Sequence, residues 1–78
     1  MSQAFLSQAG TGDRCLVLDI LPKPAALKSR LYALGIIPGS ALRILRVAPL
    51  GDPIQVKAGS SFLSIRKTEA DIIHVEIQ

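Results

Sequence analysis

Residues 41–65, ALRILRVAPLGDPIQVKAGSSFLSI, decide the fold because they alternate short apolar segments with turns. Residues 41–48 are predicted to form a strand with apolar residues on both faces. In residues 54–58 apolar and polar side chains alternate, which is typical of a half-buried strand. Residues 49–53 contain two prolines and a glycine, so they form a loop rather than a continued ladder. Residues 62–66 follow the next turn as a further strand, in which Phe62 is expected to fill the core beside two inward-facing aliphatic residues. These two inward residues are Leu63 and Ile65.

Outward from this stretch, the preceding sequence predicts one strand and one helix. Residues 14–20 are rich in Leu, Val and Ile, and prolines follow them, so they form a strand that ends there. Apolar residues then recur at helical spacing, which predicts a helix over residues 25–34. These residues are Leu27, Leu31 and Leu34. Gly35 suits the left-handed position past the helix end, and Pro38 with Gly39 forms a turn pair.

The C-terminal segment completes a mainly β fold. Thr68 and Asp71 match a capping box, which predicts a short helical turn through Ile73 before the last strand. In that strand Val75 and Ile77 are expected to face inward. The chain thus has about five strands, too few for a sandwich, and a flat sheet would leave two exposed edges. We therefore expect a small SH3-like, partly open barrel, with one helix after the first strand and residues 1–78 forming a single domain.

The composition excludes several classes of protein. With 49% hydrophobic and 19% charged residues and a mean hydropathy of +0.39, the 78-residue chain does not resemble a disordered segment. Cys15 is the only cysteine, so an intrachain disulfide is excluded. Apolar runs are much shorter than the roughly 20 residues of a membrane-spanning helix, and the N-terminus lacks a secretory pattern. We expect a cytoplasmic protein.

Nine Lys and Arg residues against six Asp and Glu residues give a formal net charge of +3. The basic residues are spread along the sequence, whereas nucleic-acid-binding proteins concentrate them on one face or in one run. The aromatic residues are few and are not interleaved with a basic cluster. We therefore expect no nucleic acid as a partner, and an acidic protein surface or a membrane-proximal partner fits the charge equally well.

The residue types present do not assemble a metal site or a catalytic centre within one subunit. Zinc sites use about four ligands drawn largely from Cys and His, and this chain has only Cys15 and His74. A single histidine without a nucleophile elbow does not support Ser-His-Asp catalysis, and the glycines form no phosphate-binding loop. We predict no enzyme activity, no cofactor and no metal site. An oligomer that gathers several copies of Cys15 and His74 stays open as a metal carrier.

Two places remain for contact with another protein. Leu50 lies on a loop stiffened by Pro49 and Pro53, and a side chain held on a stiff loop loses little entropy on docking. The alternative is that Leu50 folds back over the open mouth of the barrel. Tyr32 lies off the leucine stripe of the helix, so we expect it on the surface, and tyrosines are enriched in interfaces.

Three motifs make the chain resemble the FeoA family of ferrous iron transport proteins. They are RLYALGIIPG at residues 30–39, APLGDPI at residues 48–54 and LSIRKTEA at residues 63–70. The order and spacing extend from about Gly12 to Ile77, whereas the first dozen residues match only loosely. The resemblance implies a free-standing cytoplasmic SH3-like domain, similar to the C-terminal barrel of iron-dependent repressors.

The resemblance also implies a partner. Such proteins act with a membrane Fe(II) permease that carries a cytoplasmic GTPase domain, and this chain is expected to bind and regulate it, meeting the membrane only through that partner. The expected contacts are Leu31 and the loop Leu50, Gly51, Asp52 and Pro53. Alternatively, Leu31 lies in the core. Gly35, Pro38 and Gly39 are expected to shape turns of the backbone rather than to contact the partner. Three arginines are candidates for an arginine finger, that is, an arginine supplied to the GTPase domain to stabilise the transition state of GTP hydrolysis. They are Arg30, Arg43 and Arg46.

Two other functions stay open from the sequence. One is a nucleic-acid- or transcription-linked barrel related to the repressor domain, whose binding would weaken steeply with salt. The other is the oligomeric metal carrier, and the apolar composition also makes self-association of this chain a reasonable expectation.

Overall fold

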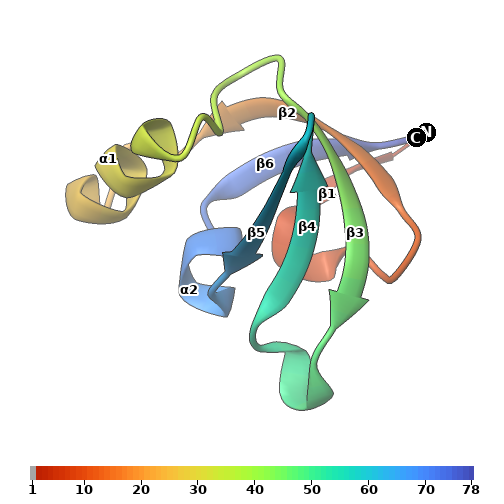
Figure 1. Cartoon of the computed structure of the whole chain (residues 1–78). Helices are drawn as coiled ribbons and strands as arrows, with labels where there is room; N and C mark the ends of the chain where they lie inside the picture. Colours follow the sequence, from red (N-terminus) through yellow and green to blue (C-terminus); the bar gives the residue numbers. More distant parts are fainter. Residues whose placement is uncertain (1) are drawn as a thin grey trace.

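The computed structural model describes residues 2–78 and shows a curled antiparallel sheet flanked by two helices (Figure 1). Its strands lie in the order β1-β6-β2-β3-β4-β5. The strands are β1 (Ser2–Phe5), β2 (Arg14–Ile20), β3 (Ala41–Val47), β4 (Ile54–Ala58), β5 (Ser61–Ile65) and β6 (Ile73–Ile77). The helices are α1 (Ala25–Ala33) and α2 (Lys67–Ala70), with short 3-10 turns η1 (Leu6–Gln8) and η2 (Pro49–Gly51).

The mainly β fold predicted from the sequence is confirmed, with six strands in place of about five. The additional strand is β1, which pairs with β6 and brings the N-terminal segment beside the C-terminal one (Figure 1). The two edge strands, β1 and β5, do not pair with each other, so the sheet does not close into a barrel. The open form leaves one side of β5 available to solvent or to a partner.

The strands of the sequence-defining stretch bury alternate residues, as the period of 2 predicts. In β3 that alternation is interrupted by a bulge between Ile44 and Arg46. Because the bulge places one extra residue opposite β4, Leu45 and Arg46 both face solvent, and Val47 returns to the core side. The bulge therefore keeps Arg46 on the solvent side, whereas Leu45 faces outward by the ordinary alternation of the strand.

Helix α1 begins after Pro24 and ends one residue earlier than predicted, with Gly35 in the left-handed conformation at φ = 85°. Gly39 has φ = 93°, so both glycines occupy positions where a side chain would be strained. One face of α1 packs on the sheet through Leu31, which has no exposed surface.

The core contains side chains from every strand except β1. From β5 only the inward-facing positions contribute. Its fully buried large members are Leu6, Val17, Leu31, Ile36, Ile44, Ile54, Val56, Ile65, Ile73 and Val75. Two expectations need correction here. Phe62 is 71% exposed rather than buried, because in a strand only one of the neighbours Phe62 and Leu63 can face inward. Thr68 and Asp71 do not form the predicted capping box, because α2 begins at Lys67 with Arg66 as its N-cap, and there the Glu69 carboxylate accepts a hydrogen bond from the Arg66 amide.

Candidate functional site

The loop between β3 and β4 presents the most exposed large apolar side chain among residues 2–78. Leu50 is 98% exposed and does not fold back over the sheet, so the alternative in which it covers the barrel mouth is wrong. Its backbone is left-handed, with φ = 70° and ψ = 9°. A non-glycine residue in that conformation costs about 1–3 kcal/mol, and no burial of the leucine offsets the cost. Strain and exposure at one residue are typical of a functional position.

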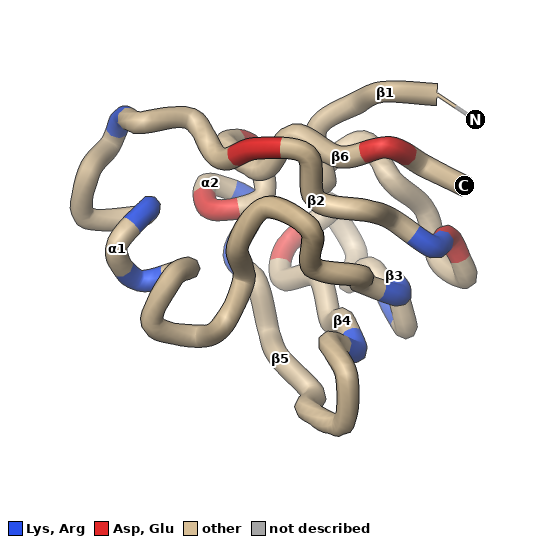
Figure 2. Tube along the Cα trace, turned by 90° about the horizontal axis from the view of Figure 1, so that it is seen from above, with Lys and Arg blue, Asp and Glu red and all other residues tan. Residues whose placement is uncertain are grey.

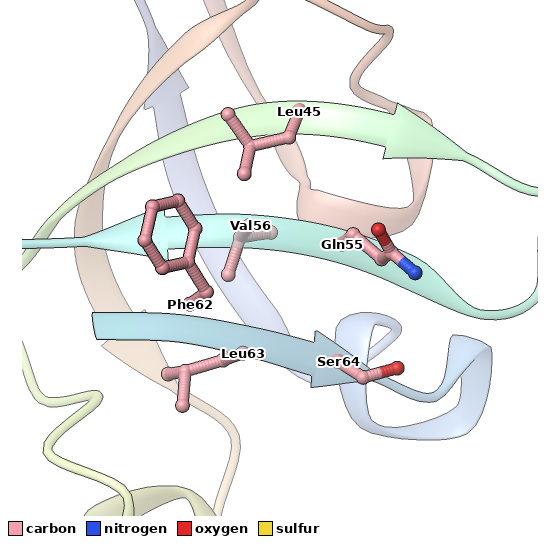
Figure 3. Close-up of a pocket in the computed structure, with 6 residues that line it drawn as sticks. All are labelled: Leu45, Gln55, Val56, Phe62, Leu63 and Ser64. Atoms are coloured by element: carbon pink, nitrogen blue, oxygen red, sulfur yellow. The ribbon is translucent and has the colours of Figure 1, made fainter.

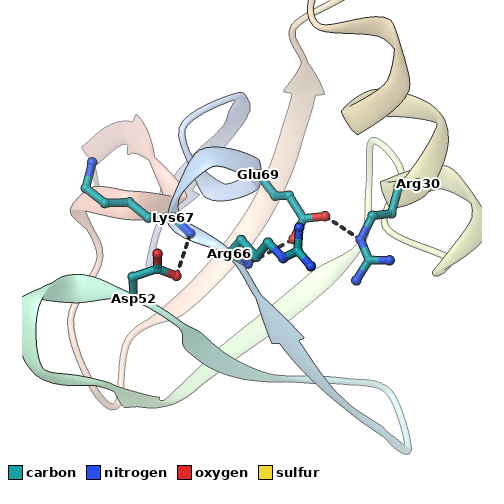
Figure 4. A network of polar contacts seen from close by, with 5 residues as sticks. All are labelled: Arg30, Asp52, Arg66, Lys67 and Glu69. Atoms are coloured by element: carbon teal, nitrogen blue, oxygen red, sulfur yellow. Dashed lines mark hydrogen bonds and ion pairs between the residues drawn. The ribbon is translucent and has the colours of Figure 1, made fainter.

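Hydrogen bonds hold this loop in one shape. The amide of Gly51 donates to the carbonyl of Ala48 at 2.9 Å, and the amide of Ala48 donates to the carbonyl of Pro53 at 3.1 Å. The Asp52 carboxylate accepts a hydrogen bond from the backbone amide of Lys67 at 3.1 Å, which ties the loop to the start of α2 (Figure 4). The structure thus gives Asp52 a positioning role, while Leu50 is the side chain that the loop displays.

An ion pair between a half-exposed arginine and a buried glutamate joins α1 to α2. Glu69 in α2 has no exposed surface, and one of its carboxylate oxygens accepts a hydrogen bond from Arg30 Nε in α1. The other oxygen accepts the backbone amide of Arg66 at 2.9 Å (Figure 4). Both oxygens are therefore satisfied, as a buried carboxylate requires. Arg30 is held by this pair, so among the three arginines considered for GTP hydrolysis it is the one already committed to the fold.

The two α1 residues expected to contact a partner lie on different sides of the helix. Leu31 is buried in the core, which favours the core alternative that the sequence left open. Tyr32 is 44% exposed, and the ammonium group of Lys28 lies 5.6 Å from its ring centroid. The helix can offer Tyr32 to another protein without rearrangement, whereas Leu31 is accessible only if α1 moves.

The outer face of β3, β4 and β5 contains an apolar pocket that the sequence analysis missed. Phe62 from β5 and Leu45 from β3 point toward each other across β4 and line a pocket of about 280 Å³ (Figure 3). Gln55 and Ser64 add polar groups to its wall. Period-2 alternation was the available signal for both residues, because it places Phe62 on the face opposite Leu63 and Leu45 on the face opposite Ile44.

Cys15 and His74 are placed unfavourably for sharing a metal ion. Burial, and secondarily the nearby charge of Asp13, raises the pKa of the Cys15 thiol to about 11. His74 instead faces Asp19, with Nδ1 3.6 Å from a carboxylate oxygen. Within residues 2–78 no three metal-ligating side chains converge. An oligomer would need to expose Cys15 before that thiol could act as a ligand.

Comparison with known protein families gives one match that spans nearly the whole chain. The FeoA domain model matches residues 5–77. Neither helix in the part of the chain that the structure describes is long and apolar enough to cross a membrane.

Individual relatives agree with this match. An Fe(2+) transport protein A/Fe(2+) transporter FeoB fusion protein of Porphyromonas gingivalis is 26% identical over 72 residues, which are 92% of this chain but only 8% of that protein. The solution structure of FeoA from Chlorobium tepidum is 42% identical, with a TM-score of 0.81, and the match covers 95% of this chain and 70% of that one. The zinc-complexed Stenotrophomonas maltophilia FeoA, described as an SH3 domain protein, is 26% identical with a TM-score of 0.79, covering 94% and 89% of the two chains.

The fold also recurs in a regulator of transcription. A manganese-dependent transcriptional repressor matches 100% of this chain and 38% of its own, with a TM-score of 0.90 at 22% identity. At that identity the likeness shows the fold alone.

Proposed function

The chain belongs to the FeoA domain family, which is involved in ferrous iron transport, and from this premise we propose that it binds and regulates a membrane ferrous iron permease bearing a GTPase domain. The protein acts in the cytoplasm and meets the membrane only through that permease. It contributes no catalytic group and supports Fe(II) uptake by contact.

The fusion protein of Porphyromonas gingivalis supports this choice of partner. Its name joins an Fe(2+) transport protein A to the transporter FeoB in one polypeptide, and the segment matching this chain is a small part of it. Two domains joined in one chain meet at high effective concentration, so a weak contact between them suffices. A free-standing chain must supply the same contact with its own surface.

One observation supports a particular contact site for the permease. Leu50 is 98% exposed and has a strained backbone conformation at the tip of a hydrogen-bonded loop. A rigid apolar side chain is pre-organised for docking, because little entropy is lost when it enters a pocket. The proposed contact surface therefore consists of Leu50 with its supporting residues Gly51, Asp52 and Pro53. Tyr32 is a second contact, offered from α1.

The test is recovery of the permease from detergent-solubilised membranes of the same organism by the tagged protein. Leu50→Asn removes the apolar side chain and suits the left-handed backbone, so the variant folds. We expect wild type to retain the permease, identified by mass spectrometry, and L50N to lose at least 80–90% of it, equivalent to about 1–1.4 kcal/mol in weak binding.

The matched control is Ile37→Asn, which makes the same kind of change at an exposed residue outside the loop. Retention of the permease by I37N supports the loop as the contact. Equal loss in I37N and L50N would contradict the assignment to Leu50, and failure of the wild-type protein to recover any permease would contradict the proposed function.

A further inference from the structure

A row of three cations crosses the outer face of the sheet next to the Phe62 pocket. Arg14 of β2 lies directly opposite Arg43 of β3, and Arg43 lies directly opposite Lys57 of β4. All three residues are exposed. The Lys and Arg positions of these three strands follow one another along one side of the molecule (Figure 2). We call Arg14, Arg43 and Lys57 the basic row.

The fold does not neutralise this row. None of the ion pairs or side-chain hydrogen bonds found among residues 2–78 involves a side chain of the basic row. The neighbouring acid, Asp13, instead accepts the backbone amide of Gly10 at 2.8 Å. Like charges directly opposite each other in a sheet destabilise it. Three of them in register are therefore a cost that folding alone does not explain.

The row lines one hollow, and its Lys57 lies beside a residue that lines a second one. Its three side chains line a pocket of about 260 Å³. Lys57 is also directly opposite Phe62, and its ammonium nitrogen lies 5.8 Å from the centroid of that ring. Lys57 thus connects the basic pocket to the apolar pocket formed by Phe62 and Leu45. A ligand that spans both needs negative charge at one end and an apolar side chain at the other.

We propose that the outer face of β2–β5 binds an extended acidic protein segment, whose carboxylates meet the basic row and whose adjacent apolar side chain enters the Phe62 pocket. Strands lie about 4.8 Å apart, so the row spans about 10 Å, and carboxylates on alternate residues of an extended segment lie about 7 Å apart. Two such carboxylates fit along the row. This inference rests on the proposed function for the source of the segment, which is the same permease.

A protein segment matches this face better than a nucleic acid does. Phe62 is the one exposed aromatic residue beside the row, whereas single-stranded nucleic acids are bound on several stacked aromatic residues along a basic groove. The net charge of +3 is also small for a surface that must neutralise many phosphates. A short acidic segment has only a few carboxylates, and the three cations of the basic row are enough to neutralise them.

The test is an NMR titration of the isotope-labelled protein with a capped synthetic peptide of alternating Glu and Leu residues. We expect amide shifts confined to β2–β5, and binding weakened at least tenfold by Arg43→Glu, which reverses the middle charge of the row. Phe62→Ser keeps the row but removes the ring, and it is expected to weaken binding about three- to tenfold. Lys23→Glu changes the net charge equally at an exposed position outside the row, and it leaves binding unchanged.

Three results would overturn the inference. They are wild-type affinity in R43E, equal weakening in K23E, and tighter R43-dependent binding of a single-stranded oligonucleotide or of phosphatidylglycerol vesicles than of the peptide. Recovery of the permease separates this inference from the proposed function. If R43E still recovers the permease while L50N does not, the proposed function stands and the basic row is not its contact; loss in R43E but not in K23E supports the row.

Discussion

At the residue scale, Leu50 carries a cost to folding that its proposed role in binding explains. Its left-handed backbone is one that Asn and Gly adopt readily and Leu does not. We expect Leu50→Asn to raise the free energy of unfolding by about 0.5–1 kcal/mol, because it relieves strain and removes no buried contact. Urea denaturation followed by circular dichroism measures the change. A less stable variant would mean that the leucine packs against the fold, and the proposal of a displayed contact would lose its basis.

Cys15 is the other residue whose surroundings set its chemistry. Its thiol is buried and has a pKa of about 11 in the folded chain, against 9.0 in the unfolded chain. Between about pH 9 and 11 the folded state therefore keeps the thiol proton that the unfolded state releases. The free energy of unfolding has the full contribution of this thiol below about pH 9, and it falls as the pH rises toward 11. Urea midpoints between pH 8 and 10.5 should fall more steeply for wild type than for Cys15→Val, which cannot titrate. Parallel slopes would contradict the shift.

At the scale of elements, the pair Arg30–Glu69 couples the two helices. Glu69 is fully buried while Arg30 is half exposed, so solvent weakens the pair relative to a fully buried one. We expect Glu69→Ala to cost about 2–4 kcal/mol, since it also removes the acceptor for the Arg66 amide, and Arg30→Ala to cost about 1–2 kcal/mol. A double-mutant cycle measured by denaturation isolates the pair, and a coupling energy near zero would contradict its role.

The hydrogen bond between the β3–β4 loop and α2 is expected to stabilise the fold less than the Arg30–Glu69 pair does. The Asp52 carboxylate accepts the Lys67 amide, so Asp52→Ala is expected to cost about 0.5–1.5 kcal/mol and to loosen the loop that carries Leu50. Asp52→Asn keeps an acceptor oxygen and serves as the control. Amide exchange of Gly51 and Lys67 reports the loosening. Equal exchange in both variants and wild type would show that the loop does not depend on Asp52.

The sequence predicts those elements whose signal is local. The strands in residues 41–65 follow from alternation, and α1 follows from leucine spacing and its flanking Pro24 and Gly35. Strand β1 has no such signal, because Ser2–Phe5 is a strand through its backbone pairing with β6. The buried Glu69 depends on an arginine 39 positions earlier in the chain, and its burial cannot be inferred from spacing. Of the proposed contacts, Leu50 follows from its proline-flanked loop, whereas the pocket depends on the pairing that places β3, β4 and β5 side by side.

For the whole molecule, the six-stranded sheet brings together charges that are scattered in the sequence. Arg14, Arg43 and Lys57 are separated by 29 and 14 positions, obtained as 43 − 14 and 57 − 43, yet pairing places them side by side. The even spread of basic residues along the chain gives no sign of this row, because strand register brings together residues that are far apart in the sequence. The basic row lies on β2, β3 and β4, and the Leu50 loop joins the last two of these strands.

This arrangement predicts how the stability of the whole protein responds to salt. Cations about 5 Å apart repel within the Debye length, which is about 10 Å at 0.1 M salt, so added salt screens the repulsion. We expect the free energy of unfolding to rise by about 0.3–1 kcal/mol between 0.02 and 0.3 M NaCl in wild type. Arg43→Glu places a negative charge between two positive ones. The free energy of unfolding of this variant should therefore exceed that of wild type at low salt, and its dependence on salt should be smaller or reversed.

The Arg30–Glu69 pair is common to both proteins, so the effect of salt on that pair cancels in the difference between them. Equal salt slopes in the two proteins would mean that the row does not strain the fold, and the surplus charge would then need no ligand to explain it.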